Sequence, residues 1–202
     1  YGASPNNYIY FNCDSYPSTN CELWRIIGVF DGKVKLMRNK SIGSYSWDTS
    51  ASSVNSGNGV NEWSQADLMK LLNPGHESES VGGSLYYNSK SGTCYSGKSN
   101  ATTSCNFTST GIKNDTTRNM IADITYNTGG HTTSNVFSNV MYEKERGITT
   151  VFNPSDGITR TTSWTGKIAL AYPSDYGYAT DLSKCSQTLY NYDNSTCRSN
   201  DW

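Results

Sequence analysis

Alternating apolar and polar positions near the N-terminus predict a β-hairpin. Its arms are LWRIIGVF (23–30) and KVKLMR (33–38), and Asp31 and Gly32 lie between them. Asp-Gly is typical of a type I′ turn, because both central residues of this turn need a positive φ. In the second arm apolar residues alternate with lysines, which predicts one buried and one solvated face. The apolar run YIYF (8–11) is a further candidate strand.

Apolar residues recur with the spacing of an amphipathic helix in three other segments. In NEWSQADLMKLLNPG (61–75) this spacing predicts a helix over 63–72 that ends at an Asn-Pro-Gly stop signal. An apolar stripe has to be covered, so we expect this helix to lie on the hairpin of residues 23–38. Two more helices are predicted, one from 114 or 115 to about 127 and one over 134–147.

Strand signals return in the C-terminal half of the chain. The runs GITTVF (147–152), RTTSW (160–164) and KIALAY (167–172) are rich in β-branched and aromatic residues, as strands commonly are. The tail from 173 to 202 is predicted to consist of turns. No internal repeat or linker interrupts the sequence, so we expect one domain over residues 1–202. Its expected fold is α+β, with antiparallel sheet, about three short helices and long loops.

Six cysteines form three couples, and each couple brackets a polar loop. The couples are Cys13 and Cys21, Cys94 and Cys105, and Cys185 and Cys197. Six cysteines allow 15 pairings, and closure within each couple is the simplest, so we predict three local disulfides. Zinc binding is the alternative, although no couple has the two-to-four-residue spacing of zinc ligands and only His76 and His131 could assist. Disulfides indicate a secreted or surface location.

The composition is that of a folded but polar chain. Only 35% of the 202 residues are hydrophobic and 16% are charged, yet 15 Tyr, 5 Trp and 5 Phe supply enough rings to build a core. The formal net charge is −1, so we expect no nucleic-acid partner. No apolar run approaches the roughly 20 residues of a membrane span. The chain begins with Tyr1 and shows no signal peptide, which indicates a mature or excised fragment.

Catalytic and cofactor motifs are sparse. A hydrolase needs a nucleophile beside a base, but neither His76 nor His131 lies in a recognised nucleophile motif, and Gly-x-Ser-x-Gly is absent. The sequence also lacks a phosphate-binding glycine loop, a dinucleotide fingerprint and an EF-hand loop. We therefore expect no cofactor and predict no metal site, while a calcium site built from scattered oxygen ligands stays open.

Aromatic residues gather around two aspartates, and such mixtures are common at recognition surfaces. One group lies in SYSWDTS and the other in AYPSDYGYAT. The candidate binding residues are Tyr45, Trp47, Asp48, Tyr172, Asp175, Tyr176 and Tyr178. The alternatives are that the two aspartates cap turns and that the tyrosines are buried structural residues.

Several motifs together resemble a group of uncharacterised secreted or surface proteins of Gram-positive bacteria. The motifs include CELWRIIGVFDGKVKLMRN, GVNEWSQADLMKLLNPG and TTSWTGKIALAYPSDYGYAT, and the resemblance covers nearly the whole chain. It implies a parent protein with a prepilin-like or other anchoring segment, held in a membrane or cell wall. Members continue past the position of Trp202 into strands similar to the last ones of C-type-lectin-like domains. The resemblance therefore implies a partial domain of that fold, and it implies no catalytic residue.

Three functions are expected, in descending order. The first is a non-enzymatic extracellular recognition or adhesion domain that binds a glycan, or a host or surface protein, through the two aromatic groups. The second is a structural subunit of a pilus-like filament that self-associates through strand edges such as residues 8–11. The third is a glycan hydrolase that uses Asp48 or Asp175 as its carboxylate.

Overall fold

The computed structural model describes residues 5–49, 59–97, 100–153 and 157–200, and its fold is α+β with antiparallel sheets. The strands are β1 (Tyr8–Phe11), β2 (Glu22–Phe30), β3 (Lys33–Arg38), β4 (Ser91–Tyr95), β5 (Thr102–Asn106), β6 (Ile124–Asn127), β7 (Thr150–Asn153), β8 (Ile158–Thr161) and β9 (Ser163–Gly166). The α-helices are α1 (Asp67–Leu72), α2 (Asp115–Met120), α3 (Ser138–Gly147), α4 (Pro173–Ala179) and α5 (Ser195–Arg198). Strands β1, β2 and β3 form one sheet in that order, and β4–β5, β6–β9 and β7–β8 form two-stranded sheets.

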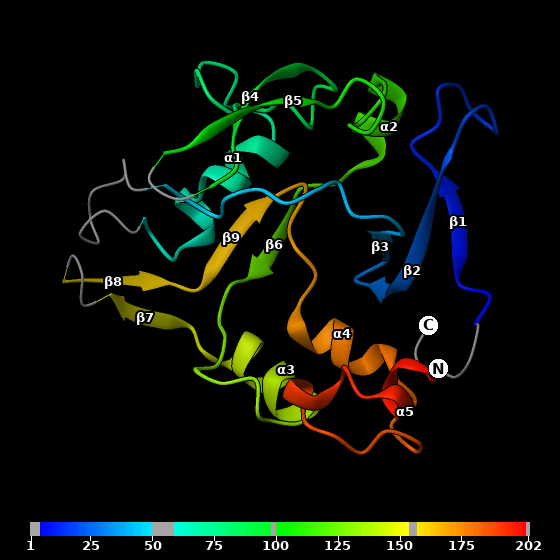
Figure 1. Cartoon of the computed structure of the whole chain (residues 1–202), viewed down its shortest axis with the longest axis vertical. Coiled ribbons are helices and arrows are strands. Elements are labelled where there is room, and N and C mark those ends of the chain that lie inside the picture. The colour runs from blue at the N-terminus through cyan, green and yellow to red at the C-terminus, as the bar shows by residue number, and fades with distance from the viewer. Residues whose placement is uncertain (1–4, 50–58, 98–99, 154–156, 201–202) are drawn as a thin grey trace.

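The elements occupy distinct regions of the molecule (Figure 1). The β4–β5 sheet lies at the top with α1 and α2, and β6 and β9 cross the centre. The β7–β8 hairpin projects to the left, the β1–β2–β3 sheet stands at the right, and α3, α4 and α5 gather at the bottom. Of the helices in the described ranges, none combines the length and the apolar character that a membrane crossing demands.

The predicted hairpin is confirmed. β2 and β3 pair antiparallel, and Asp31 and Gly32 between them have φ values of 48° and 72°, the positive values that a type I′ turn requires. The predicted strand at residues 8–11 is also confirmed, and it pairs with β2 so that Tyr8 lies opposite Arg25. In the three-stranded sheet β1 is therefore an edge strand.

Aromatic rings build much of the main core, as the tyrosine-rich composition suggests. Its buried members are Trp63, Ala66, Met69, Leu71, Leu72, Tyr86, Tyr87, Cys94, Cys105, Phe107 and Ile112. Two pairs of rings meet edge to face: the centroids of Tyr86 and Phe107 lie 5.6 Å apart, and those of Trp63 and Trp164 lie 5.8 Å apart. Aromatic pairs prefer this geometry because the positive edge of one ring meets the negative face of the other.

The helix predicted over residues 63–72 is divided, and it packs in a different place. A 3₁₀ turn, η2 (Trp63–Gln65), precedes α1, and between them Ala66 is fully buried and extended, with ψ of 137°. The buried residues of α1 join the core around Tyr86, which includes none of the described residues 23–38. The prediction that this helix lies on the hairpin of residues 23–38 is therefore wrong. An apolar stripe shows that a helix is covered, but the stripe does not identify the surface that covers it.

The helix predicted to reach about residue 127 is shorter than expected. α2 ends at Met120, and β6 follows and pairs with β9. In β6 Ile124 and Tyr126 alternate with polar residues, and Tyr126 lies opposite Trp164. A strand partner that is distant in the sequence thus overrides the helical spacing of the apolar residues.

The last third of the chain contains more helix and less strand than predicted. α3 confirms the third helix but begins later, at Ser138. β7, β8 and β9 form near the first two predicted strands, whereas the described residues 167–172 form no strand, and α4 and α5 replace predicted turns. Pro173 opens α4, and Asp175 accepts the N–H of Tyr172 at 2.9 Å. These are ordinary helix-start signals.

The three predicted disulfides are confirmed. They join Cys13 to Cys21, Cys94 to Cys105, and Cys185 to Cys197. The first closes the loop after β1, the second links β4 to β5, and the third builds a second, smaller core with Tyr192. All six cysteines lie within the described ranges and none is free, so the zinc alternative is excluded.

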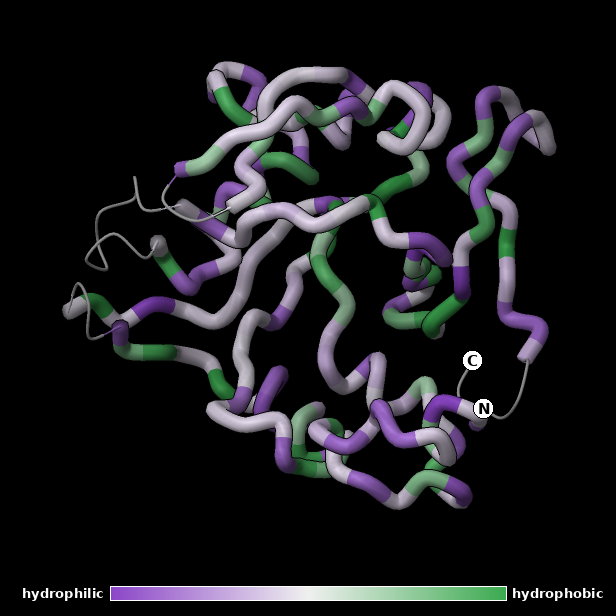
Figure 2. Tube along the Cα trace, in the orientation of Figure 1, coloured by the Kyte–Doolittle hydropathy of each residue, from purple (hydrophilic) through white to green (hydrophobic). Residues whose placement is uncertain are grey.

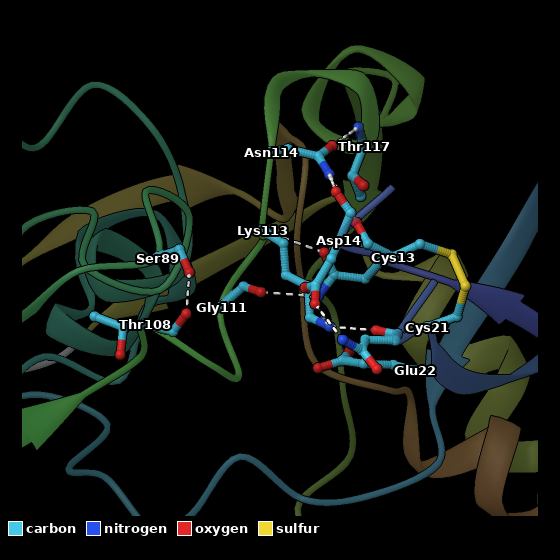
Figure 3. A network of polar contacts seen from close by, with 12 residues as sticks. Cys13, Asp14, Cys21, Glu22, Ser89, Thr108, Gly111, Lys113, Asn114 and Thr117 are labelled. Carbon is cyan, nitrogen blue, oxygen red and sulfur yellow. Dashed lines mark hydrogen bonds and ion pairs between the residues drawn. A yellow bond between two sulfur atoms is a disulfide. The ribbon is translucent and has the colours of Figure 1, made fainter. Parts of the chain in front are cut away.

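A network of polar contacts anchors the first disulfide loop to the segment before α2 (Figure 3). The fully buried Asn12 donates to the carbonyl of Gly111 at 2.8 Å and accepts the N–H of Lys113 at 2.8 Å. Asn114 caps α2 and donates its side-chain amide to the carbonyl of Cys13 at 2.7 Å. The network fixes the end of β1, and with it the three-stranded sheet, against the rest of the fold.

Candidate functional site

The first predicted group lies on the segment before η2 and packs on the main core. The rings of Tyr45 and Trp47 contact Phe107 and Trp63, with centroid distances of 5.5 and 5.4 Å. Asp48 accepts the N–H of Val60 at 2.6 Å. Trp47 keeps 38% of its surface exposed, so its ring can still contact a ligand.

Asp48 also lies beside a second carboxyl group, that of Asp67 in the first turn of α1. Burial raises the pKa of Asp67, and the neighbouring Asp48 raises it further. The hydroxyl of Thr49 donates to Asp67 at 2.9 Å, and Lys70 Nζ lies 3.5 Å from it. Both contacts favour the ionised form and oppose the rise. The net result is a pKa of Asp67 above its ordinary value, with burial as the largest cause.

The second predicted group lies at the start of α4, next to β3 and α3. The ring of Tyr172 contacts two cations, with Lys35 Nζ at 4.5 Å and the Arg146 guanidinium at 4.3 Å from its centroid. Lys35 also forms an ion pair with Asp175, which caps α4. Burial raises the pKa of the Tyr172 hydroxyl. Together these contacts hold α4 against the three-stranded sheet.

The structure places the two predicted groups in different parts of the fold. Tyr176 and Tyr178 on α4 pack on Tyr192 and Tyr142, with centroid distances of 5.6 and 6.2 Å, whereas the first group packs on the main core. Asp48 and Asp175 both accept backbone N–H groups, as their alternative turn-capping role requires. A binding role for the seven residues stays a prediction.

The β1–β2–β3 sheet exposes apolar side chains, although the sequence predicts a helix that covers the hairpin of residues 23–38. They are Tyr8, Ile9, Tyr10, Leu23, Val29, Phe30 and Val34. Every residue of these three strands is described, and none of them is fully buried. Apolar positions of β2 and β3 stand out at the right of the view in Figure 2. The apolar run of β2 was visible in the sequence. What the sequence did not show is that α1, the helix expected on this hairpin, packs in the main core instead.

A pocket of about 250 Å³ lies where the end of α1 meets the end of β9. Its lining residues are Met69, Asn73, Pro74, His76, Asp123, Trp164, Thr165, Gly166 and Lys167. The side chain of Asn73 joins the two walls, because it donates to the carbonyls of Met69 and Ile168 and accepts the N–H groups of Lys167 and Ile168. Sequence reasoning missed this pocket, since its walls come from segments that are distant in the sequence.

The two histidines occupy different environments. His76 lines the pocket, whereas His131 lies in an exposed loop, where its Nδ1 accepts the N–H of Thr133 at 3.2 Å. Within the described ranges, no cluster of three His, Cys, Asp or Glu side chains could hold a metal ion.

Comparisons with protein-family models, with curated proteins and with solved structures find no match to this chain. The resemblance to Gram-positive surface proteins and to a lectin-like fold stays a prediction. Functional proposals therefore have to rest on the exposed sheet and on the pocket.

Proposed function

We propose that this chain is a non-enzymatic extracellular recognition domain that binds another protein through the β1–β2–β3 sheet. The observation that carries the proposal is the exposed apolar surface of that sheet. The three local disulfides support a location outside the cytoplasm, where such bonds persist. We do not propose hydrolysis, because the carboxylates of Asp48 and Asp175 are both engaged in backbone hydrogen bonds.

The sheet offers apolar surface that folded proteins commonly use for interactions. Tyr10 is 69% exposed, and on its face of the sheet it lies directly opposite the exposed Leu23 and two residues from the exposed Tyr8. Val29 lies opposite Val34 on the other face. A group of neighbouring exposed apolar side chains, such as Tyr8, Tyr10 and Leu23, is typical of interaction sites. An extended apolar sheet suits a protein better than a small sugar, because a protein buries several of these side chains at once.

The outer edge of β1 adds backbone groups to this surface. Ile26 donates its N–H to the carbonyl of Asn7 at 2.7 Å, continuing the register of β1 and β2. Hydrogen-bonded pairs alternate along an antiparallel ladder. Ile9 is therefore bonded to β2, whereas the N–H and C=O groups of Tyr8 and Tyr10 point outward. An extended segment of a partner can add to β1 as a fourth strand.

Binding of the purified, disulfide-bonded chain to immobilised collagen, fibronectin and fibrinogen and to a glycan array tests the proposal. Tyr10→Ser removes an exposed ring from the sheet. Tyr190→Ser is the matched control, because Tyr190 is 72% exposed on the 3₁₀ turn η3 (Leu189–Asn191). We expect a protein ligand whose affinity falls about tenfold or more in the Tyr10 variant alone. Binding of glycans only, or equal effects of the two variants, would contradict the proposal.

A pilus-like filament subunit is the second candidate, and the edge of β1 favours it. The strand YIYF contains no lysine, proline or bulge, the features that commonly protect an exposed edge from pairing with another copy. A filament would form if the open edge of β1 in one copy paired with the β3 edge of the next copy, because β1-to-β1 pairing would close a dimer. This candidate differs from the first in needing no partner other than the chain itself.

Sedimentation velocity over a range of protein concentrations separates the two candidates. Tyr10→Pro removes an outward N–H group without removing a ladder bond to β2. A filament subunit should associate as its concentration rises, and the proline variant should remain monomeric. A wild-type chain that is monomeric at every concentration would eliminate the filament.

A further inference from the structure

Polar groups with hydrogen-bonding capacity to spare line the pocket between α1 and β9. Lys167 Nζ donates to the carbonyl of Ile121 at 2.9 Å and to Asp123 Oδ2 at 3.2 Å, so within the described residues one of its three N–H groups is left for a ligand. The side chain of Asp123 is 65% exposed, and its Oδ1 can accept. His76, which is half-buried, is a further polar residue of the pocket lining.

The indole of Trp164 supplies the apolar part of the same pocket, and its orientation is fixed. Its centroid lies 5.8 Å from that of Trp63 and 5.6 Å from that of Tyr126. Gly166 allows the indole to lie against the strand, because a Cβ at this position would be 2.2 Å from the ring. A ring that is held before a ligand arrives loses little conformational freedom on binding.

We propose that this pocket binds a single pyranose ring of a glycan. Its volume of about 250 Å³ is just below the roughly 300–1,000 Å³ of pockets for drug-sized ligands, which leaves room for about one ring. Lys167 and Asp123 neutralise each other, so the pocket favours an uncharged ligand over an ion.

The chemistry of a sugar ring matches the groups on the pocket wall. Neighbouring hydroxyls each donate and accept, so two of them can bond to the ammonium of Lys167 and the carboxylate of Asp123 together. The C–H face of the ring can cover the indole of Trp164, which is apolar on its faces. Glycine and acetate lack an apolar face that could cover the indole, so neither can satisfy the whole wall.

This inference goes beyond the proposed function, because none of the pocket residues belongs to the three-stranded sheet. The two proposals can therefore fail separately. Tyr10→Ser should leave sugar binding unchanged, and changes in the pocket should leave protein binding through the sheet unchanged.

Saturation-transfer difference NMR with methyl glycosides of glucose, galactose, mannose and N-acetylglucosamine tests the pocket in the intact chain. Glycine and acetate serve as zwitterionic and anionic comparisons. We expect at least one glycoside to bind with a dissociation constant on the order of 1 mM, as befits a ligand of about a dozen non-hydrogen atoms. No binding of any glycoside up to roughly 20 mM, about twenty times that constant, would overturn the proposal.

Two variants and a control localise the binding. Asp123→Asn and His76→Gln should each weaken the glycoside about tenfold, the effect of losing one hydrogen bond to a charged or strongly polar group. Asp115→Asn replaces a carboxylate that is 88% exposed on α2 and lies outside the pocket, so it should have no effect. Near-UV circular dichroism checks that all three variants keep the fold. Equal binding by the two Asp variants, or stronger binding of glycine or acetate than of any glycoside, would overturn the proposal.

Discussion

Replacing Asn73 by alanine tests whether one buried amide joins the helical wall of the pocket to its strand wall. Asn73 is 3% exposed. It donates to the carbonyls of Met69 at 3.0 Å and Ile168 at 2.8 Å. Its Oδ1 accepts the N–H groups of Ile168 at 2.9 Å and Lys167 at 3.2 Å. Alanine removes all four hydrogen bonds and leaves both backbone groups of Ile168 without this partner.

The expected loss follows from the number of bonds and their burial. A typical hydrogen bond contributes a net stability of about 0.5–1.5 kcal/mol, and a buried group left without a partner costs about 1–3 kcal/mol. The four bonds share one side chain, so their contributions are not additive. We expect the free energy of unfolding to fall by about 3 kcal/mol, a large part of the roughly 5–15 kcal/mol of an ordinary domain.

Urea unfolding of the disulfide-bonded protein measures this loss. The midpoint should fall while the slope of the free energy against urea stays unchanged. Asn88→Ala is the matched control, because the side chain of Asn88 makes one exposed hydrogen bond, to Glu77 at 3.1 Å. That variant should differ from wild type by less than about 0.5 kcal/mol. Similar effects of the two substitutions would refute the reasoning.

Three further predictions concern stability. Asp67→Asn should raise the urea midpoint at pH 7, because burial and a neighbouring carboxyl raise the pKa of Asp67 and make its ionised form unfavourable in the fold. This gain in stability should shrink as the pH falls through the raised pKa of Asp67. It should vanish below the ordinary value of 3.8, where the Asp67 carboxyl is protonated in both the folded and the unfolded wild type. A gain that does not change with pH, or no gain at pH 7, would contradict this prediction. Replacing Cys185 and Cys197 together by serine should lower the free energy of unfolding by about 3 kcal/mol for a loop of this length, and an unchanged urea midpoint would count against it. Gly166→Ala should lower the free energy of unfolding by roughly 1–3 kcal/mol, because the added Cβ would lie 2.2 Å from the indole of Trp164. Gly130→Ala, whose Cβ would have no atom within 4 Å, should be neutral. Similar thermal unfolding of the two variants would rule this prediction out.

The features that could be predicted from the sequence are those that local chemistry determines. The Asp31-Gly32 turn needs only its own two residues to adopt positive φ. The disulfide between Cys94 and Cys105 joins residues only 11 positions apart, so its closure is local, although the strands β4 and β5 that carry it were not predicted. The hairpin and the three cysteine pairs were therefore predicted correctly.

The features that were missed depend on partners distant in the sequence. Met120, Ile121 and Ile124 have helical spacing, but residues 124–127 form a strand because β9 is available to pair with them. The apolar stripe of α1 indicated that this helix is buried on one side. It could not indicate which surface covers that side. α4 is different, because its starting signals at Pro173 and Asp175 lie within the sequence and were interpreted as turn signals.

The same distinction applies to the candidate sites. Sequence reasoning selected aromatic clusters that are local, such as the one around Asp175. The pocket needs His76, Asp123 and the near neighbours Trp164 and Lys167. These residues come from three separate parts of the chain, and their proximity exists only in the folded protein. The exposure of the β1–β2–β3 sheet is likewise a tertiary property, since it depends on which other elements fail to cover it.

The central claim is that the apolar three-stranded sheet is the binding surface of the domain. The most direct measurement is the ratio of the dissociation constants of Tyr10→Ser and Tyr190→Ser for the same immobilised protein ligand, with both variants checked for folding. The account predicts a ratio of about ten or more. A ratio near one, with the wild-type chain binding that ligand, would show that the binding surface lies elsewhere.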